Sequence, residues 1–551
     1  MELLSEQQLQ NFPKEAVIAL YLQMGDSLRT VISQNAELRD QNAVLLKKVD
    51  TLQEDVAVLV QNRFGRKTAK VEKQTDGQYY FDVNTMAILN EAEVLTENGK
   101  AEEPEVEEVI VHRTHRRPTG KQVKDLEAIP KKTLDCTFPE ETLKQLFPDG
   151  YSELPTSDAK PLLEYTPAQF QQIIYRIHVY KGKDGTIVRA PHPERLFNNS
   201  LATPSMVSAT MNAKYINAVP LERFSDELKK YDVILSREVL ATWMIRASDR
   251  YFFPLYGLMQ ERMIQSASLI HCDETPFVLV NNGRGPGSKD YMWVYHTGPS
   301  YGSPPVYLYQ YCPTRKTENP ERFLEGYSGV LMTDGYQVYH SLEKKKGGSL
   351  KVAGCWAHMK RKYSEVRKSL GGKTSHGLLC TEAEKKISAI YAVDNAEKGQ
   401  SPEKILQNRQ TVVKKLVDAY FDWVREKIPL VDPSSATGRA LQYSLNQEPF
   451  LRVFLDDPKI PLDNNDAERS IRKFCVGKKN WQICASKNGA EASAVLYSVA
   501  ETAKANGLRP YFYFKYVMEQ MLLYQDGTDR SFLDDLLPWS DKLPEYCRAK
   551  K

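Results

Sequence analysis

Leucines recur every seven residues near the amino terminus, at positions 38, 45, 52 and 59, and a second set alternates with them at spacings of three and four: Asn35, Asn42, Val49 and Val56. Residues 15–62 contain no proline and a single glycine, so this pattern predicts one long helix. Leucine at one seam position, with valine or asparagine at the other, is typical of a parallel two-stranded coiled coil. A helix that packs on its own domain is the alternative interpretation.

Charge, rather than hydrophobicity, distinguishes the segments that follow. Residues 90–108 contain eight glutamates and predict a linker, whereas residues 112–121 are basic and predict a flexible arm. Between about 125 and 195, apolar residues alternate with polar ones, and Lys183-Asp184-Gly185 is a turn sequence. These features predict the strands of a small α+β domain.

Helical periodicity returns over residues 203–250, in two segments separated by a short turn. Ser236 stands where it would cap the second helix. This outline is that of a helix-turn-helix, in which the second helix enters a major groove, and it would place Arg237 and Arg246 near DNA. Ordinary packing of two helices is the alternative.

Apolar runs of strand length dominate from residue 263 onward. Three strands, a helix, a strand, a helix, a strand and a helix follow one another between residues 266 and 366, which is the order of an RNase H-like domain. Residues 376–460 have helical periodicity and interrupt this order, which resumes at Leu462. We therefore expect an α/β fold: an RNase H-like catalytic domain with a helical insertion, preceded by an N-terminal coiled coil, a small α+β domain and a helix-turn-helix-like region.

The same patterns predict the domain organisation. The expected segments are 1–73 (N-terminal helix and coiled coil), 74–124 (acidic and basic linker), 125–200 (small α+β domain), 201–262 (helical DNA-binding region), 263–375 (first part of the catalytic core), 376–460 (helical insertion), 461–525 (second part of the core) and 526–551 (tail).

Composition limits the function classes only a little. The net charge of +3 is too small to indicate nucleic-acid binding by itself, so such a function must depend on local basic clusters. Eight cysteines without a CxxC pair favour a reducing compartment over a disulfide-bonded secreted protein. No signal peptide and no apolar run of transmembrane length is visible, so we expect a cytoplasmic protein that does not contact a membrane.

Three acidic residues stand out by their surroundings. Asp273 and Asp334 each lie where an apolar strand meets a turn, and a carboxylate there needs either a divalent cation or the hydrogen bonds of the turn. Glu468 follows three residues after Asn465, a good N-cap, and taken alone this spacing fits a capping box. Together the three make a D…D…E set on the expected strand order. Cations crowd around Glu468: Arg469, Arg472, Lys473, Lys478 and Lys479.

Several phrases of the sequence resemble those of the IS66-family DDE transposases. The most specific is LDNNDAERSIRKFCVGKKNW (462–481), and the N-terminal coiled coil with its basic exit RFGRKTAK (63–70) fits the same family. The other phrases are HCDETP (271–276), LMTDGYQVY (331–339), CWAHMKRKY (355–363) and LLPW (536–539).

The resemblance implies a DNA transposase that cuts transposon ends by metal-assisted phosphodiester hydrolysis and joins the 3′-OH to target DNA. Asp273, Asp334 and Glu468 would be both the catalytic residues and the ligands of two Mg²⁺ ions, with Mn²⁺ as a substitute. The alternatives are a DNA-binding regulatory protein without chemistry, and an RNase H-like nuclease that acts on other structured DNA.

The implied partners are double-stranded DNA, both terminal inverted repeats and target, a second copy of the chain or a higher oligomer, and small accessory proteins of the same element. The expected location is the nucleoid in a prokaryotic cytoplasm. The basic side chains expected to contact DNA are Arg66, Lys67, Arg237, Arg246, Arg469, Arg472, Lys478 and Lys479.

Zinc is not expected. Many family members carry a cysteine-rich zinc module before the catalytic domain, but the corresponding region here offers only Cys136. A second set, Cys355 and His358 with His376 and Cys380, has the spacing of zinc ligands, yet the glycine pair at 371–372 favours a mobile loop between the two halves. Trp356 and Trp481 suit the core better than the stacking of an unpaired base.

Overall fold

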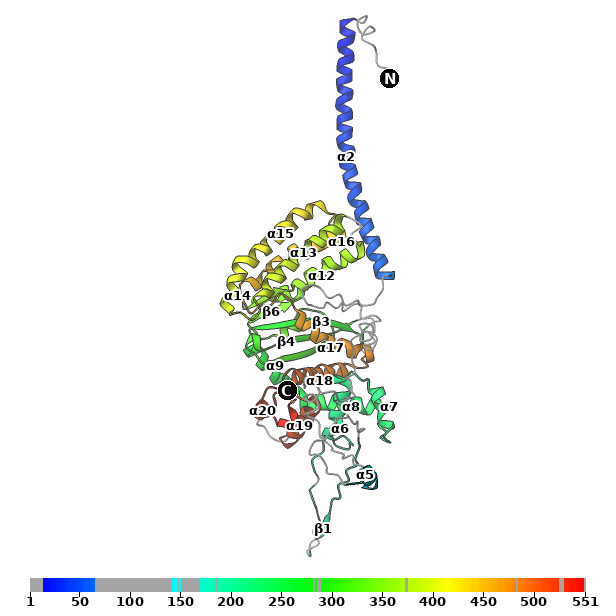
Figure 1. Cartoon of the computed structure of the whole chain (residues 1–551), viewed down its shortest axis with the longest axis vertical. Helices are drawn as coiled ribbons and strands as arrows, with labels where there is room; N and C mark the ends of the chain where they lie inside the picture. Colours follow the sequence, from blue (N-terminus) through cyan, green and yellow to red (C-terminus); the bar gives the residue numbers. More distant parts are fainter. Residues whose placement is uncertain are drawn as a thin grey trace.

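The computed structural model places a mixed sheet at the centre of the molecule, with helices on both of its faces and one long helix projecting from it (Figure 1). This arrangement confirms the expected α/β class. The structure describes residues 13–64, 140–146, 148–149, 169–181, 183, 187–191, 193–280, 283–284, 289–371, 375–481, 484–524 and 530–549.

The helices and strands follow the predicted alternation closely. The strands are β1 (Val179–Lys181), β2 (Ile187–Arg189), β3 (Leu269–Phe277), β4 (Asp290–Thr297), β5 (Val306–Cys312), β6 (Gly329–Thr333) and β7 (Leu350–Gly354). The helices before the sheet are α2 (Lys14–Phe64), α5 (Glu140–Leu146), α6 (Pro204–Met211), α7 (Leu221–Lys229), α8 (Arg237–Ala247) and α9 (Phe253–Ser266).

The remaining helices interleave with the later strands or follow them. They are α10 (Glu318–Phe323), α11 (Gln337–Lys346), α12 (Trp356–Leu370), α13 (Ser375–Ala396), α14 (Pro402–Asn408), α15 (Lys414–Lys427), α16 (Ala436–Leu451), α17 (Asn465–Trp481), α18 (Lys487–Ala505), α19 (Pro510–Leu523) and α20 (Leu533–Leu536).

The five-stranded sheet has the order β5-β4-β3-β6-β7. β3, β4 and β5 form an antiparallel meander, whereas β6 and β7 join β3 in parallel. The first strand, β3, is therefore central. α10 lies in the crossover from the edge strand β5 to β6, and α11 lies in the crossover between the parallel neighbours β6 and β7. At the edge, hydroxyls of α18 accept from the amides of β5: Tyr309 N–H to Ser498 Oγ at 2.7 Å and Tyr307 N–H to Thr502 Oγ1 at 3.0 Å. These bonds satisfy an edge that would otherwise be open.

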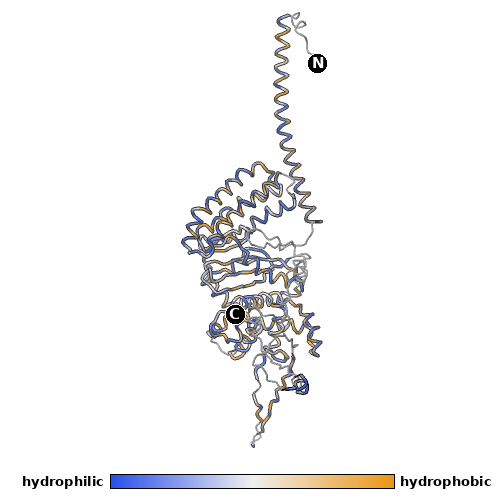
Figure 2. The backbone as a smooth tube through the Cα atoms, viewed as in Figure 1, coloured by the Kyte–Doolittle hydropathy of each residue, from blue (hydrophilic) through white to orange (hydrophobic). Residues whose placement is uncertain are grey.

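Two hydrophobic cores pack against the sheet. One is formed with α6, α8, α9, α11, α17, α18 and α19, and it takes Ile270 and Cys272 from one face of β3 and Phe277 from the other, where α17 packs. The other is formed with α12, α13, α15 and α16, and it takes Leu269 from β3, Met332 from β6 and Ala353 from β7. Figure 2 shows the apolar strands of the sheet between these two helical layers. The helical insertion predicted for 376–460 is thus a layer on one face.

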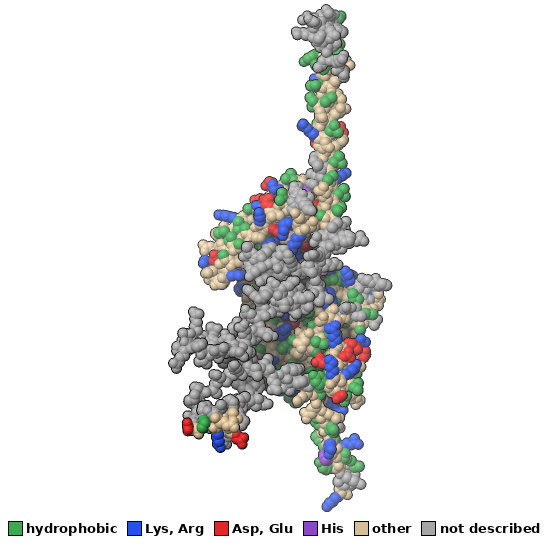
Figure 3. Space-filling model, turned by 45° about the vertical axis from the view of Figure 1, so that its right-hand side comes forward, with side chains coloured by type: hydrophobic (Ala, Val, Ile, Leu, Met, Phe, Trp, Pro, Cys, Tyr) green, Lys and Arg blue, Asp and Glu red, His purple; other side chains and the backbone are tan. Residues whose placement is uncertain are grey.

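Helix α2 carries an exposed apolar seam along its length. In the projecting part, the predicted heptad positions are exposed, among them Leu38, Leu45 and Leu52, and the pattern continues toward the amino terminus through Val31, Leu28, Met24 and Tyr21. Figure 3 shows apolar side chains spaced along the projecting helix. The single helix is confirmed, whereas its pairing into a coiled coil stays a prediction.

The carboxyl-terminal part of α2 is anchored on the insertion by one buried carboxylate. Glu54 is fully buried and accepts from His376 Nδ1 at 2.9 Å, from the Thr437 amide at 3.1 Å and from the Thr437 hydroxyl at 2.9 Å. Burial opposes ionisation, but the bonds from His376 and Thr437 outweigh it and hold the pKa of Glu54 below its usual range. Because Thr437 lies in the first turn of α16, the helix dipole also favours the negative charge.

The anchor and the seam occupy opposite sides of α2. Glu54 is two residues after Leu52 and two before Val56, and both of these seam residues are exposed while Glu54 is buried. In heptad terms Glu54 holds the position diametrically opposite the seam. The body therefore leaves the seam uncovered by any of the described residues.

Other predictions have mixed outcomes. The hairpin around Lys183 exists as β1 and β2, although its strands span only three residues each. The two helices predicted within 203–250 are present as α7 and α8, and α6 precedes them. Ser236 caps α8 by accepting from the Val239 amide. The acidic linker, the basic arm and the strand predicted near residue 130 lie outside the described residues. Among the helices described, none combines the length and the apolarity needed to cross a membrane.

Glu54→Ala should weaken the attachment of α2 to the insertion. The change leaves His376 and the Thr437 amide without their buried acceptor, so the free energy of local opening should fall by about 1–3 kcal/mol. Hydrogen exchange of the amides around Glu54 measures this opening. Asp40→Ala, an exposed change on the same helix, is the control and should leave exchange at Glu54 unaltered; equal effects of the two variants would contradict the anchoring role.

Candidate active site

Asp273 and Asp334 lie side by side at the ends of two neighbouring parallel strands. The register of β3 and β6 pairs Leu269 with Val330 and His271 with Met332. Continued by two residues along each strand, the same register brings Asp273 level with Asp334, immediately after β6 ends. Adjacent strands lie about 4.8 Å apart, so the two aspartates are close neighbours.

Strand alternation directs Asp273 toward the insertion. Leu269 of β3 packs into the core on that side, so Asp273, four residues later, faces the same way, and Asp334 shares a face with Met332. Glu274 faces the opposite side, where Tyr339 Oη donates to it at 2.7 Å and Arg315 forms an ion pair with it. Of the two adjacent acids, Glu274 therefore has a cationic partner, whereas Asp273 has none among the described residues.

Neither aspartate forms an ion pair with a described cation. Among the described residues, the hydrogen bonds to their carboxylates come from backbone amides: Glu274 N–H to Asp273 at 2.9 Å and Tyr336 N–H to Asp334 at 3.0 Å. Burial raises the pKa of Asp273 well above its usual range, and the charges of Glu274, Asp334 and Glu468 raise it further. Burial and the Glu274 charge likewise raise the pKa of Asp334. A cluster of buried carboxylate oxygens with unrelieved repulsion fits a hard divalent cation.

Gly335 allows the insertion to approach this turn. A Cβ at Gly335 would overlap the Tyr443 hydroxyl and the Gln447 side chain of α16. Gln447 Nε2 also donates to the Gly335 carbonyl at 3.4 Å. The Asp-Gly pair at the end of β6 is thus required by packing as well as by the turn.

Glu468 lies in the first turn of α17 but does not cap it. The helix begins at Asn465, and the carbonyl of Asn464 accepts from the Glu468 amide at 3.2 Å, so Asn464 is the N-cap. The predicted cap at Asn465 was one residue late, because Asp463 already satisfies the Asn465 amide at 3.2 Å. With Glu468 at the fourth helical position, the capping box is not formed, and its carboxylate is directed elsewhere.

That carboxylate binds the side chains of α12. Arg361 Nη2 donates to Glu468 Oε2 at 2.8 Å and to Oε1 at 3.1 Å, and His358 Nδ1 lies 3.5 Å from Oε1. Cys355 is also near: its sulfur, a ring nitrogen of His358 and an oxygen of Glu468 lie within 4.8 Å of one another. Among the described residues, His376 and Cys380 do not join this group, since His376 binds Glu54.

Buried Asn464 connects three parts of the site. Its amide oxygen accepts from His271 Nδ1 at 2.7 Å, its Nδ2 donates to the Cys272 carbonyl at 2.8 Å, and its backbone amide donates to Cys355 Sγ at 3.2 Å. His271 Nε2 in turn lies 3.2 Å from the Tyr301 hydroxyl. Asn464 thereby fixes the start of α17 to β3 and to the start of α12.

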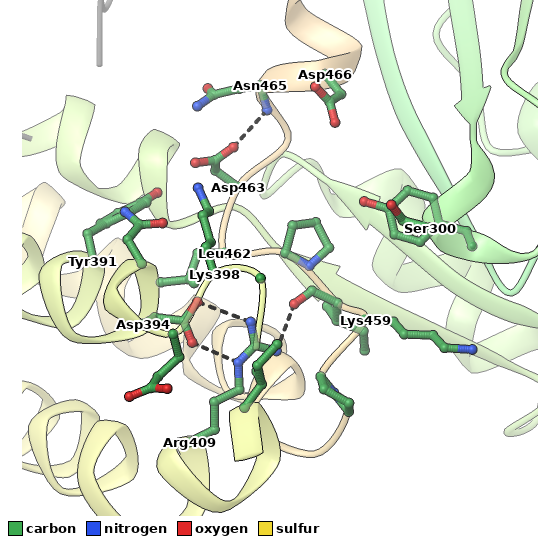
Figure 4. A pocket seen from close by; sticks show the side chains of 18 of the residues that line it. Ser300, Tyr391, Asp394, Lys398, Arg409, Lys459, Leu462, Asp463, Asn465 and Asp466 are labelled. Carbon is green, nitrogen blue, oxygen red and sulfur yellow. Dashed lines mark hydrogen bonds and ion pairs between the residues drawn. The ribbon is translucent and has the colours of Figure 1, made fainter. Parts of the chain in front are cut away.

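A cleft of about 910 Å³ leads to Glu468 between the insertion and α17. In Figure 4, Lys398 of the insertion reaches toward Asp463, and Ser300 lies on the opposite wall. Arg409 lies at the base, where it is held by Asp394 at 2.7 Å and by backbone carbonyls. The residues of α12 and α17 that line the cleft are Arg361, Asn465, Asp466, Glu468, Arg469 and Arg472.

The predicted DNA-contacting side chains fall into separate groups. Arg469 and Arg472 line the cleft, and Arg469 pairs with Asp466. Lys478 and Lys479 lie at the other end of α17, where Lys478 Nζ donates to the Pro276 carbonyl at 2.7 Å. Arg66 and Lys67 lie outside the described residues.

Arg237 and Arg246 are both exposed on α8 but do not share a face. They are nine residues apart, two and a half turns, and therefore point to opposite sides of the helix. Arg237 pairs with Glu222 and Glu238, and the Arg246 guanidinium lies 4.3 Å from the centre of the Phe197 ring. The structure does not bring these two arginines together as one groove-facing surface.

Both tryptophans considered for base stacking, Trp356 and Trp481, belong to the cores. Trp356 is fully buried and its Nε1 donates to the Leu451 carbonyl at 2.9 Å. Trp481 packs against the other core and contacts Phe474, with ring centres 5.5 Å apart. The packing role that the sequence favoured for both is the one observed.

Residue-by-residue reasoning overlooked Arg361 and Asn464. Each stood inside a quoted phrase, CWAHMKRKY or LDNNDAERS, yet neither was given a role. A basic residue three positions after His358, on the same helix face, was the available signal for Arg361. The contacts of Asn464 join segments nearly two hundred positions apart, and one sequence offers no signal for them.

Comparison with known proteins gives consistent matches. A family model described as "Transposase IS66 family" matches residues 199–492, which is more than half of the chain and includes all three acids, and one described as "IS66 C-terminal element" matches residues 498–539. The uncharacterized protein y4qI of Sinorhizobium fredii (strain NBRC 101917 / NGR234) is 27% identical over 395 residues, covering 70% of this chain and 71% of that protein. The uncharacterized protein y4jD of the same organism is 28% identical over 410 residues, covering 72% and 76%.

Asp273→Asn should stabilise the metal-free protein at neutral pH. Because the folded-state pKa of Asp273 is raised, stability falls as the pH rises from the ordinary carboxyl pKa of the unfolded chain toward the raised pKa, and asparagine removes this cost. We expect a gain on the order of 1 kcal/mol or more in EDTA. Unfolding by denaturant measures it, and the gain should shrink toward acidic pH, where the wild-type carboxyl is neutral. A loss of stability at neutral pH would contradict the unrelieved repulsion.

Proposed function

The chain belongs to the IS66 family of transposases, and from this we propose that it is a DNA transposase of the DDE type. In this proposal the protein binds the terminal inverted repeats of its element, hydrolyses a phosphodiester bond at each end and joins the freed 3′-OH to target DNA. Asp273, Asp334 and Glu468 are the proposed catalytic residues. The observation that carries the proposal is the placement of Asp273 and Asp334 at one level of two parallel strands, with Glu468 close enough to act on Asp273 electrostatically.

The sheet supports an RNase H-like assignment of the catalytic core. Three antiparallel strands are followed by two parallel ones, and the first strand of the chain order is central. One acid lies on that central strand, the second follows its parallel neighbour, and the third comes from α17, which packs against β3 and β4. The insertion separates the second acid from the third without disturbing this order.

The chemistry follows from the residue types. Three carboxylates offer the oxygen ligands that Mg²⁺ prefers, with Mn²⁺ as a substitute. When bound, two such ions would stabilise the attacking and leaving oxygens of an in-line displacement at phosphorus. The surrounding chain holds the carboxylates in place: Asn464 and His271 fix the start of α17, and the Tyr336 amide orients Asp334.

DNA would enter by the cleft beside Glu468. Arg469 and Arg472 line it and would pair with backbone phosphates, which positions a strand without specifying its sequence. Sequence recognition of the ends would then belong to other elements, such as α8. There Arg237 and Arg246 would contact different parts of a duplex, because they point to opposite sides.

The exposed seam of α2 would pair with the same seam of a second copy in a parallel coiled coil. Eight heptad residues from Tyr21 to Leu45 fit the seam, with Asn35 and Asn42 among them fixing register and dimer state. Since Glu54 anchors the opposite side of the helix, pairing requires no rearrangement of the body. Two catalytic domains would thereby be held together, as the joining of two DNA ends requires.

Leu45→Asp should convert the full-length dimer into a monomer, because a charge at the seam must be desolvated on pairing. Val44→Asp is the matched control: the same chemical change, at an equally exposed neighbouring position that lies off the seam. Sedimentation velocity at micromolar concentration should show a monomer for the first variant and a dimer for the second. A monomeric wild-type protein would rule out the coiled-coil dimer.

Glu468→Gln should reduce cleavage of terminal-repeat DNA in Mg²⁺ by orders of magnitude, since glutamine keeps the shape but not the negative charge that a hard cation requires. Glu491→Gln is the matched control, since it makes the same substitution at an exposed glutamate of α18 that does not line the cleft; it should cleave at nearly the wild-type rate. A folded Glu468→Gln protein with full activity would refute the assignment.

The same assay separates the two alternative functions. A regulatory derivative would bind terminal-repeat DNA without cleaving it even as wild type. A general nuclease would cleave duplexes that lack the repeat equally well.

A further inference from the structure

Arg361 binds the carboxylate of Glu468, which is one of the proposed metal ligands. Its Nη2 donates to both oxygens of Glu468, at 2.8 and 3.1 Å, and the Glu468 side chain is only 7% exposed. A divalent cation that ligates Glu468 competes with this ion pair, since the guanidinium and the cation need the same lone pairs. Of the three proposed ligands, Glu468 is thus the one that starts out paired.

His358 does not hold Glu468 in the same way. Arg361 Nη1 lies 3.4 Å from His358 Nε2, and because a guanidinium only donates, Nε2 must accept and neutral His358 carries its proton on Nδ1. That Nδ1 is buried, lies 3.5 Å from Glu468 Oε1 and has no hydrogen-bond partner among the described residues. If Arg361 moves away, His358 Nδ1 is placed to donate a hydrogen bond to Glu468.

The Arg361 side chain can also reach the cleft through which DNA would enter. It lines the cleft together with Arg469 and Arg472, and its side chain is 24% exposed, more than three times the fraction of Glu468. Guanidinium binds phosphate as well as carboxylate, in the same forked geometry. A strand that enters the cleft would therefore offer Arg361 an alternative anion within reach of its present position.

We infer that Arg361 exchanges from Glu468 to a DNA phosphate, so that entry of DNA into the cleft releases Glu468 for the divalent cation. Arg361 is then a positioning residue that couples metal loading to substrate binding. The inference depends on the proposed function, because it takes Glu468 as a metal ligand. Its consequence is reciprocal: DNA tightens metal binding and metal tightens DNA binding by the same factor.

The test measures Mn²⁺ affinity of the full-length protein by electron paramagnetic resonance, with and without a duplex that carries the terminal repeat. For wild type we expect DNA to increase Mn²⁺ affinity by about 5- to 150-fold, the usual range of such coupling. In Arg361→Gln, Mn²⁺ should bind more tightly without DNA, and the enhancement by DNA should drop severalfold. Any enhancement that remains comes from phosphate oxygens that ligate the ion directly.

Arg367→Gln is the matched control. Arg367 lies on the same helix and forms an ion pair with Glu384 at 3.0 Å, so this variant removes the same charge and a similar contact away from Glu468. It should retain the wild-type enhancement by DNA. An unchanged enhancement in Arg361→Gln would overturn the inference, since a purely structural or electrostatic Arg361 alters Mn²⁺ affinity equally with and without DNA.

Two further variants keep the result unambiguous. If Arg361→Gln does not fold, Arg361→Lys retains the positive charge but not the fork; a reduced enhancement supports the exchange and a wild-type enhancement contradicts it. Glu468→Gln tests the premise: unchanged Mn²⁺ affinity in that variant would reject Glu468 as a ligand and with it the proposed function. Weakened Mn²⁺ binding in Glu468→Gln, with a wild-type enhancement in Arg361→Gln, would reject only the exchange.

Discussion

Repulsion between Asp273 and Asp334 is the constraint around which this site is built. The parallel pairing of β3 and β6 places them about one strand spacing apart, and at an effective dielectric constant of 20 two unit charges at 5 Å repel by about 3 kcal/mol. Glu274 adds a third charge from the other face of the sheet, where Arg315 forms an ion pair with it and Tyr339 donates a hydrogen bond to it. A bound divalent cation would relieve this repulsion. Without the cation, the repulsion lowers the stability of the folded protein.

Elements distant in sequence hold this strained arrangement together. Asn464 joins the start of α17 to β3 and to Cys355, and Gly335 lets α16 pack directly over the turn that carries Asp334. The insertion is therefore a structural wall of the site, not an appendage. Its removal would expose the buried face of the sheet where Leu269 and Met332 now lie.

Much of this organisation could be predicted from the sequence, for identifiable reasons. Strands and helices of the core are long and strongly periodic, and Asp273 and Asp334 interrupt apolar runs, so both the element order and the two acids were visible. The N-cap of α17 was predicted one residue too late because Asn464 and Asn465 are equally good caps. Asn464 is the cap in the structure, where it binds His271, a residue of a strand nearly two hundred positions earlier. Glu54 shows the same limit, since nothing local predicts that an acid on a polar helix face will be buried against His376.

The Glu54 anchor also has a mechanical consequence. From Lys14 to Glu54 the helix rises 1.5 Å per residue and is about 60 Å long, so it acts as a lever with its fulcrum at the insertion. A tilt of about 10° at Glu54 would displace the far end by roughly 10 Å, the width of a helix. The three bonds to Glu54, together with the packing of α2 against α12 and α16, therefore set the direction of the far end of the helix, and small changes of packing at this attachment are magnified along its length.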